Sequence, residues 1–166
     1  TGAVAGTLVS LAELYVQQMR LDEAEALLTR AIGIWERVLD PRHPAVARAL
    51  SALALLYLEQ KRLPEAETLQ RRSTEILEHA MGPQHPDLAT ALGNFALVHH
   101  AQGKFAQAES LYRRALAIRE RSLGSDHLLV ADSLDALAET LRSNSKQVEA
   151  LALRKRAEEI RTSRQP

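Results

Sequence analysis

The chain has 166 residues, of which 46% are hydrophobic and 25% are charged, and its 21 Lys and Arg balance its 21 Asp and Glu. This composition is typical of a globular domain, and the zero net charge argues against a general nucleic-acid binder or a protein held to membranes by charge. Because the chain has no cysteine, disulfides, thiolate catalysis and cysteine-ligated zinc are excluded.

The hydrophobic pattern predicts helices along the whole chain. Apolar residues recur at three- and four-residue steps over residues 88–99, stop near Gly103 and resume over residues 105–118. Pro86 suits a first helical turn, and Gly103 suits the left-handed position that ends a helix. Applied to the whole chain, the pattern predicts helices over 2–18, 22–39, 44–60, 64–81, 86–102, 106–123, 128–143 and 147–162.

A 42-residue period groups these helices into four helix–turn–helix copies, approximately 1–42, 43–84, 85–126 and 127–166, which we expect to form a single domain. Seven columns are identical in all four copies: Ala5/Ala47/Ala89/Ala131, Leu8/Leu50/Leu92/Leu134, Ala12/Ala54/Ala96/Ala138, Ala24/Ala66/Ala108/Ala150, Leu27/Leu69/Leu111/Leu153, Arg30/Arg72/Arg114/Arg156 and Ile34/Ile76/Ile118/Ile160. The alanines let antiparallel helices approach closely, and the larger residues fill the space between copies. Since one helix pair cannot bury both of its faces, the copies must stack.

We find no catalytic or metal-binding motif in the repeated sequence. His43, His85 and His127 recur once per copy, so we interpret them as helix-start residues rather than as ligands of one metal ion. The sequence contains no Gly-rich phosphate loop, nucleophile motif or triad spacing. We therefore expect no enzymatic activity and no cofactor or metal site.

The third copy resembles the tetratricopeptide repeat (TPR) signature. The residues that carry the resemblance are Phe95-Ala96 followed by Gly103-x-Phe105-x-x-Ala108-x-x-x-Tyr112-x-x-Ala115. The simple repeat has a period of about 34 residues. The longer period here, opened by His-Pro and closed by Leu-Gly, is similar to the kinesin-light-chain type. The resemblance implies an all-α solenoid of four repeats that forms a right-handed superhelix.

The resemblance also implies a concave groove lined by the first helix of each copy. Carried over position by position, the peptide-binding residues are Glu13, Arg48, Ser51, Leu55, Leu58, Asn94, Leu97, His100, Asp135, Glu139 and Arg142. Further positions on the same face are Val9, Val16, Ala52, Thr90, Gly93 and Asp132.

Three of these assignments have a plainer alternative. Asn94 can pair with the backbone of an extended peptide, or it is a solvated helix residue. Arg48 can meet a carboxylate, or it forms a surface salt bridge. Leu55, Leu58 and Leu97 form an apolar strip in the groove, or they are packing residues displaced by one step from the expected phase.

The last copy gives the groove an acidic end. Asp132, Asp135 and Glu139 all lie on its first helix. We therefore expect a bound peptide to place its basic residues toward this copy.

We expect a scaffold that binds a peptide segment of a partner protein in this groove. Two alternatives stay open: a self-associating structural array, and a regulatory module that senses a small ligand or a signalling peptide. The expected partners are proteins or peptides, without nucleic acid or membrane. No apolar run approaches the roughly 18–20 residues that span a bilayer and no signal peptide is visible, so we expect a cytoplasmic location.

Overall fold

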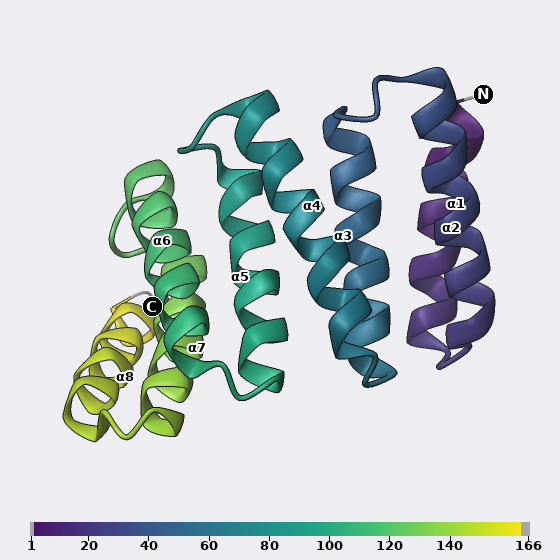
Figure 1. The fold of residues 1–166 in the computed structure, drawn as a ribbon. Helices are drawn as coiled ribbons and strands as arrows, with labels where there is room; N and C mark the ends of the chain where they lie inside the picture. The colour runs from purple at the N-terminus through teal and green to yellow at the C-terminus, as the bar shows by residue number, and fades with distance from the viewer. Residues whose placement is uncertain (1, 164–166) are drawn as a thin grey trace. The chain divides into compact units, whose positions relative to one another are not determined.

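The computed structural model describes residues 2–163, and over this range the chain is all-α (Figure 1). The helices are α1 (Gly2–Gln17), α2 (Leu21–Val38), α3 (Pro44–Glu59), α4 (Leu63–Met81), α5 (Pro86–Ala101), α6 (Phe105–Leu123), α7 (Leu128–Ser143) and α8 (Gln147–Thr162). The predicted helices are confirmed, and each boundary lies within one residue of the predicted one. None of these helices combines the length and the apolar character that crossing a membrane requires.

Successive helices pack as antiparallel pairs, and the alanine columns lie where the two helices of a pair meet. Ala12 of α1 and Ala24 of α2 are fully buried, and their counterparts in the next pair, Ala54 and Ala66, are buried to the same extent. Any larger side chain at these positions would push the helices apart. The four predicted helix–turn–helix repeats are thus confirmed as α1/α2, α3/α4, α5/α6 and α7/α8.

The chain divides into two compact units, which we call unit 1 (Thr1–Gly82) and unit 2 (Pro83–Pro166). In unit 1, the second helix of the first pair, α2, packs against the first helix of the next pair, α3. In unit 2, α6 packs against α7 in the same manner. Each unit therefore contains one complete junction between neighbouring repeats.

The recurring histidines begin first helices, as the sequence predicts. His43, His85 and His127 precede α3, α5 and α7 with extended backbone conformations. In each case the imidazole Nδ1 accepts a hydrogen bond of 3.1 Å from the backbone N–H two residues further along. These imidazoles satisfy one of the free N–H groups at the helix start.

The turn inside each repeat needs one residue in the left-handed region of backbone space. Gly103 adopts φ of 74°, as predicted for a helix-ending glycine. Met19, Lys61 and Ser145 occupy the same position in the other repeats and adopt φ of 59°, 61° and 61°. The turn geometry is therefore kept even where a side chain makes it costly.

A glutamate at the start of a second helix ties unit 1 together across its junction. Glu25 of α2 accepts a hydrogen bond of 2.9 Å from the hydroxyl of Tyr57. It also forms an ion pair of 3.0 Å with Arg62, whose guanidinium lies 3.8 Å from the centre of the Tyr57 ring. We call Glu25 and its counterpart Glu109 the junction glutamates. This role was not predicted from the sequence.

The junction glutamate of unit 2 has different donors. Glu109 is buried and accepts hydrogen bonds from Lys146 at 2.9 Å, from Asn144 at 3.2 Å and from Arg113 at 2.9 Å. Burial alone would raise the pKa of this carboxyl, but the hydrogen bonds from Lys146, Arg113 and Asn144 outweigh it and hold the pKa below its ordinary value. Glu109 is thus ionised at neutral pH and stabilises the junction.

Candidate peptide-binding surface

The first helices of unit 1 border a hollow of about 410 Å³. Four residues that the sequence predicts for the groove meet here: Glu13 and Val16 from α1, and Ala52 and Leu55 from α3. The remaining lining residues are Ala12, Gln17, Leu28, Leu56 and Glu59. The hollow exists because Ala12 and Ala52 are small, so the walls do not close over the buried Leu28 and Leu56.

The hollow combines an apolar interior with acidic edges. Leu28 and Leu56 are each 2% exposed and form its floor, while Val16 and Leu55 are half-buried along its sides. Glu13 and Glu59 are exposed, and within residues 2–163 neither carboxylate forms a hydrogen bond or an ion pair. Such a site suits an apolar side chain that has a positive charge beside it.

Two exposed lining residues, Gln17 and Glu59, are missing from the sequence prediction. Gln17 follows Glu13 by four positions, and Glu59 follows Leu55 by four positions. Residues spaced by four lie on the same face of a helix, so this spacing was a usable signal. Both directly follow predicted groove residues, Val16 and Leu58, so the prediction missed a neighbouring column of the repeat rather than a further turn of the helix.

Ser51 does not face the hollow. Its side chain is buried, and its hydroxyl accepts a hydrogen bond of 3.0 Å from Nε2 of Gln70 on α4. The structure therefore places Ser51 inside the α3/α4 pair rather than on the predicted groove. The other two predicted residues of α3 lie outside the hollow's lining: Arg48 is exposed, and Leu58 is half-buried.

The predicted residues of α5 lie in unit 2. Leu97 is 43% exposed, and Asn94 is half-buried. His100 connects the two first helices of this unit, because its Nε2 lies 3.3 Å from the hydroxyl of Ser143 on α7. The same imidazole packs edge-to-face on Phe105 with the ring centres 5.2 Å apart. These contacts make His100 a structural residue as well as a candidate binding residue.

The predicted acidic end on α7 is neutralised by the neighbouring helix α8. Arg161 of α8 forms ion pairs with both Asp132 and Asp135, at 2.9 and 2.7 Å. Hydrogen bonds to Asp135 and Asp132 raise the pKa of Arg161 above its ordinary value. Both carboxylates therefore already have a positive partner.

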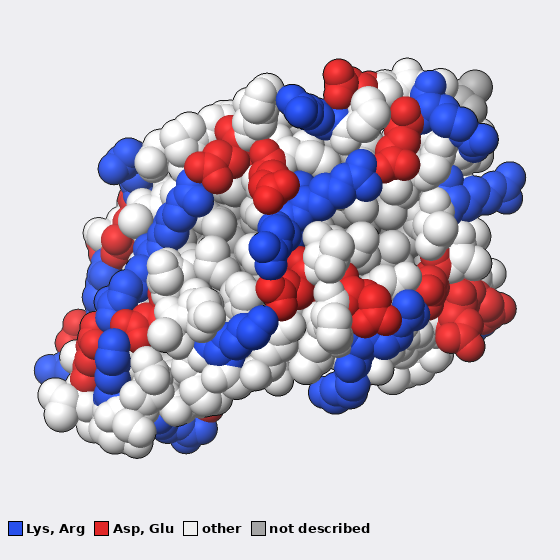
Figure 2. All heavy atoms as spheres, viewed as in Figure 1, with Lys and Arg blue, Asp and Glu red and all other residues white. Residues whose placement is uncertain are grey.

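Glu139 is compensated in the same way. It forms ion pairs with Arg142 of its own helix at 2.5 Å and with Arg154 of α8 at 3.1 Å. Of the first-helix carboxylates, those beside the hollow of unit 1 are consequently the better placed to attract a basic ligand. On the face drawn in Figure 2, basic and acidic side chains lie interspersed, as expected for a surface laced with such pairs.

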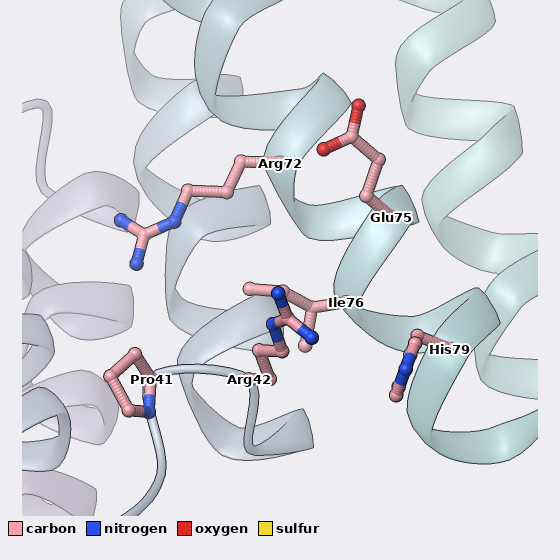
Figure 3. A pocket seen from close by; sticks show the side chains of 6 residues that line it. All are labelled: Pro41, Arg42, Arg72, Glu75, Ile76 and His79. Atoms are coloured by element: carbon pink, nitrogen blue, oxygen red, sulfur yellow. The ribbon is translucent and has the colours of Figure 1, made fainter.

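A second hollow of unit 1, of about 430 Å³, is less suited to bind one ligand group. Its lining residues are Pro41, Arg42, Arg72, Glu75, Ile76 and His79 (Figure 3). Arg72 is directed away from His79 and forms an ion pair of 2.6 Å with Glu36. Because the polar groups do not converge on one point, this hollow lacks the arrangement that fixes a ligand.

Comparison with known proteins supports the repeat assignment. The family model described as tetratricopeptide repeat matches residues 3–79, 53–121 and 87–163, which together span almost the whole chain. No curated protein sequence matches the chain.

Several solved structures share the fold at low sequence identity. The crystal structure of BtubC (BKLC) from P. vanneervenii is 22% identical with a TM-score of 0.89, covering 96% of this chain and 63% of that one. A putative kinesin light chain with nearly identical TPR-like repeats from Podosopora anserina is 23% identical with a TM-score of 0.89, covering 100% of this chain and 79% of that one. The apo form of RapI is 16% identical with a TM-score of 0.84, covering 97% of this chain and 57% of that one. With its 42-residue period, antiparallel helix pairs and matching family model, the chain belongs to the tetratricopeptide repeat family.

Proposed function

We propose that the protein is a scaffold that binds a segment of a partner protein along its first helices, with one apolar side chain of that segment in the hollow between α1 and α3. Tetratricopeptide repeats generally serve as protein–protein interaction modules, which supports the class of function. The partner's anchoring residue is aliphatic or aromatic, and a lysine or arginine lies next to it in the segment.

The observation that carries this proposal is the pairing of an apolar hollow with free carboxylates. Leu55 and Val16 offer apolar surface beside a space of about 410 Å³, which accommodates one large side chain. Glu13 and Glu59 carry negative charge that nothing in the described part of the chain neutralises. A cation beside the anchor would therefore gain attraction without first breaking an existing ion pair.

The test is to select peptides from a random display library on the full chain and to measure their binding by fluorescence polarisation. We expect enrichment of peptides with one large apolar residue next to Lys or Arg. Leu55→Glu in the protein should weaken binding by roughly tenfold or more, because it places a charge in the desolvated centre of the contact.

Leu151→Glu is the control. Leu151 lies on the second helix α8 and is 67% exposed, so the same substitution there should leave binding along the first helices unchanged. The proposal fails if the selected peptides tolerate Leu55→Glu, or if acidic peptides are enriched instead.

The charge preference has its own test. Replacing Glu13 and Glu59 together by glutamine should lower affinity for the basic peptides by several-fold at low salt, and the loss should shrink as salt screens the pairs. A peptide whose Lys or Arg is replaced by glutamine should bind both proteins equally. Equal losses for the basic and the neutral peptide would show that the carboxylates act through packing rather than through charge.

A further inference from the structure

Each first helix of unit 1 carries a single acidic residue, and both of these residues border the hollow. Glu13 is the only Asp or Glu of α1, and Glu59 is the only one of α3. Both line the hollow, and neither carboxylate forms a hydrogen bond or an ion pair within residues 2–163. The hollow therefore receives one uncompensated negative charge from each of its two walls.

The two carboxylates lie at diagonally opposite corners of the hollow. The helices α1 and α3 run in the same direction, since both are antiparallel to α2 (Figure 1). Leu55 occupies the position of Glu13 one period later, and Glu59 lies four residues beyond Leu55. Four residues advance an α-helix by about 6 Å. The wall of α1 is thus acidic at the level of Glu13, where the wall of α3 is apolar, and the wall of α3 becomes acidic one turn further on.

An apolar side chain seated in the hollow separates the two carboxylates. It enters above Leu28 and Leu56, between the walls that carry Glu13 and Glu59. With this side chain in place, one cation cannot lie within the roughly 4 Å of an ion pair from both carboxylates. The only Lys or Arg of α1 and α3 is Arg48, which precedes Glu59 by eleven residues, or roughly 16 Å along the helix. Two separate cations from a ligand are therefore needed to compensate both charges.

The corresponding positions of unit 2 lack this arrangement. Two periods later, Leu97 of α5 stands in the place of Glu13, and Ser143 of α7 stands in the place of Glu59. The hydroxyl of Ser143 lies 3.3 Å from Nε2 of His100. The pair of acids is thus a property of unit 1 and does not follow from the repeat pattern.

We infer that the partner segment carries a basic residue on each side of its apolar anchor, one or two positions away, and that one of them pairs with Glu13 and the other with Glu59. This inference rests on the proposed function of the hollow and adds a second charge and its placement. Because α1 and α3 are connected through α2, their axes lie further apart than the roughly 8–10 Å of helices packed on each other. In an extended segment, the residues two positions before and after the anchor are about 13 Å apart and point to the same side as the anchor. Their side chains therefore reach both walls.

The experiment compares labelled peptides of identical composition on the full chain. Each contains one Phe and two Arg among Ser and Ala. In the flanked peptide the arginines lie two positions before and two positions after Phe, and in two one-sided peptides both precede or both follow Phe. Since all three have the same net charge, unspecific attraction is equal. We expect the flanked peptide to bind about three- to fivefold more tightly in fluorescence polarisation at low salt, and salt should reduce this difference.

Single substitutions assign each arginine to its glutamate. Of two peptides that keep only the first or only the second arginine, Glu13→Gln should weaken one by about three- to fivefold and Glu59→Gln only the other. The pairing reveals the direction of the bound segment. Asp22→Asn is the control of equal charge, because Asp22 is exposed at the start of α2 and outside the lining of the hollow, and it should leave both peptides unchanged. Circular dichroism confirms that each variant keeps its helices.

The outcomes separate this inference from the proposed function. If flanked and one-sided peptides bind equally and Leu55→Glu still weakens them, the inference is overturned and the proposed function stands. The same conclusion holds if one glutamate accounts for the effect of both arginines. If Leu55→Glu weakens none of the peptides, the proposed function and the inference fail together.

Discussion

Units 1 and 2 share their caps, turns and helix pairing, yet they treat the carboxylates of their first helices in opposite ways. In unit 1, Glu13 and Glu59 border an apolar hollow and have no ionic partner within the described chain. In unit 2, Asp135 and Glu139 are held by arginines of α8. The repeat fixes where a side chain is placed, and the neighbouring helix decides whether its charge is available to a ligand.

One column shows the contrast within a single position of the repeat. It holds Glu13, Leu55, Leu97 and Glu139 in successive copies. Glu13 and Leu55 meet at the hollow of unit 1, whereas Glu139 lies in an ion-pair cluster. Equivalent backbone positions therefore carry unlike chemistry, so functional residues cannot be transferred from repeat to repeat by alignment alone.

The largest expected effect comes from core substitutions that test whether units 1 and 2 unfold independently of each other. Leu50→Ala and Leu134→Ala remove the same invariant leucine from unit 1 and unit 2, and each should cost about 2–5 kcal/mol through lost burial and a cavity. Trp35 is the only tryptophan of the chain and reports on unit 1. We expect Leu50→Ala to lower the urea midpoint seen by Trp35 fluorescence more than Leu134→Ala does. Equal shifts would mean that the two units unfold together.

The junction glutamates give the next largest effect. Glu109→Gln should destabilise the protein by about 1.5–3 kcal/mol, because a buried carboxylate loses charged hydrogen bonds. Since the folded pKa of Glu109 lies below the ordinary value of 4.5, its stabilisation is complete above that pH and is lost as the pH falls through the folded pKa. Urea unfolding at a series of pH values should therefore show the difference between wild type and Glu109→Gln shrinking in acid. A difference that does not depend on pH would assign the loss to packing.

Substitutions in the turns inside the repeats should have smaller effects on the free energy of unfolding, with opposite signs in the two units. Gly103→Ala should cost about 1 kcal/mol, because a Cβ is strained at positive φ. Lys61→Gly should gain a few tenths of a kcal/mol up to about 1, because it relieves that strain at the price of a more flexible unfolded chain. Thermal unfolding monitored by circular dichroism measures both. A loss on Lys61→Gly would show that the Lys61 side chain contributes contacts that outweigh the strain.

Arg161→Gln is the substitution with the smallest expected effect on stability, but we expect it to change binding. Arg161→Gln breaks two exposed ion pairs, so stability should change by only about 0–1 kcal/mol. The same substitution frees Asp132 and Asp135 and should make unit 2 resemble unit 1 in charge. We expect tighter binding of an oligolysine peptide at low salt, measured by calorimetry. Unchanged binding would argue that availability of charge is not what distinguishes the units.

The helices could be predicted closely from the sequence because the period averages out local ambiguity. Each helix boundary occurs four times in the sequence. His85 and Gly103 mark a helix start and a helix end clearly in the third copy, and the period transfers these boundaries to copies with a weaker signal, such as the one where Lys61 replaces the glycine. The family assignment rests on the same redundancy. The pattern does not encode ion pairs between helices, since Asp132 and Arg161 lie 29 residues apart in sequence.

The residues that line the hollow of unit 1 could be predicted only in part. Glu13 and Leu55 are correctly brought together because helical spacing and the column positions place them on facing first helices. Ser51 was misplaced because its column also holds Val9, Gly93 and Asp135, which gives no consistent polarity from which to judge burial. Its partner, Gln70, is an unusual buried polar residue that a count of apolar positions cannot reveal.

The unlike donors around the two junction glutamates have a consequence for how the chain assembles. A polypeptide made of near-copies can pair a helix with the wrong neighbour while it folds, since each copy offers almost the same apolar face. Glu25 accepts from a tyrosine hydroxyl, whereas Glu109 accepts from an amide and an ammonium group. A helix shifted by two whole repeats would meet donors of different reach and hydration. The unlike donors therefore favour the native pairings of α2 with α3 and of α6 with α7 over pairings between the wrong repeats.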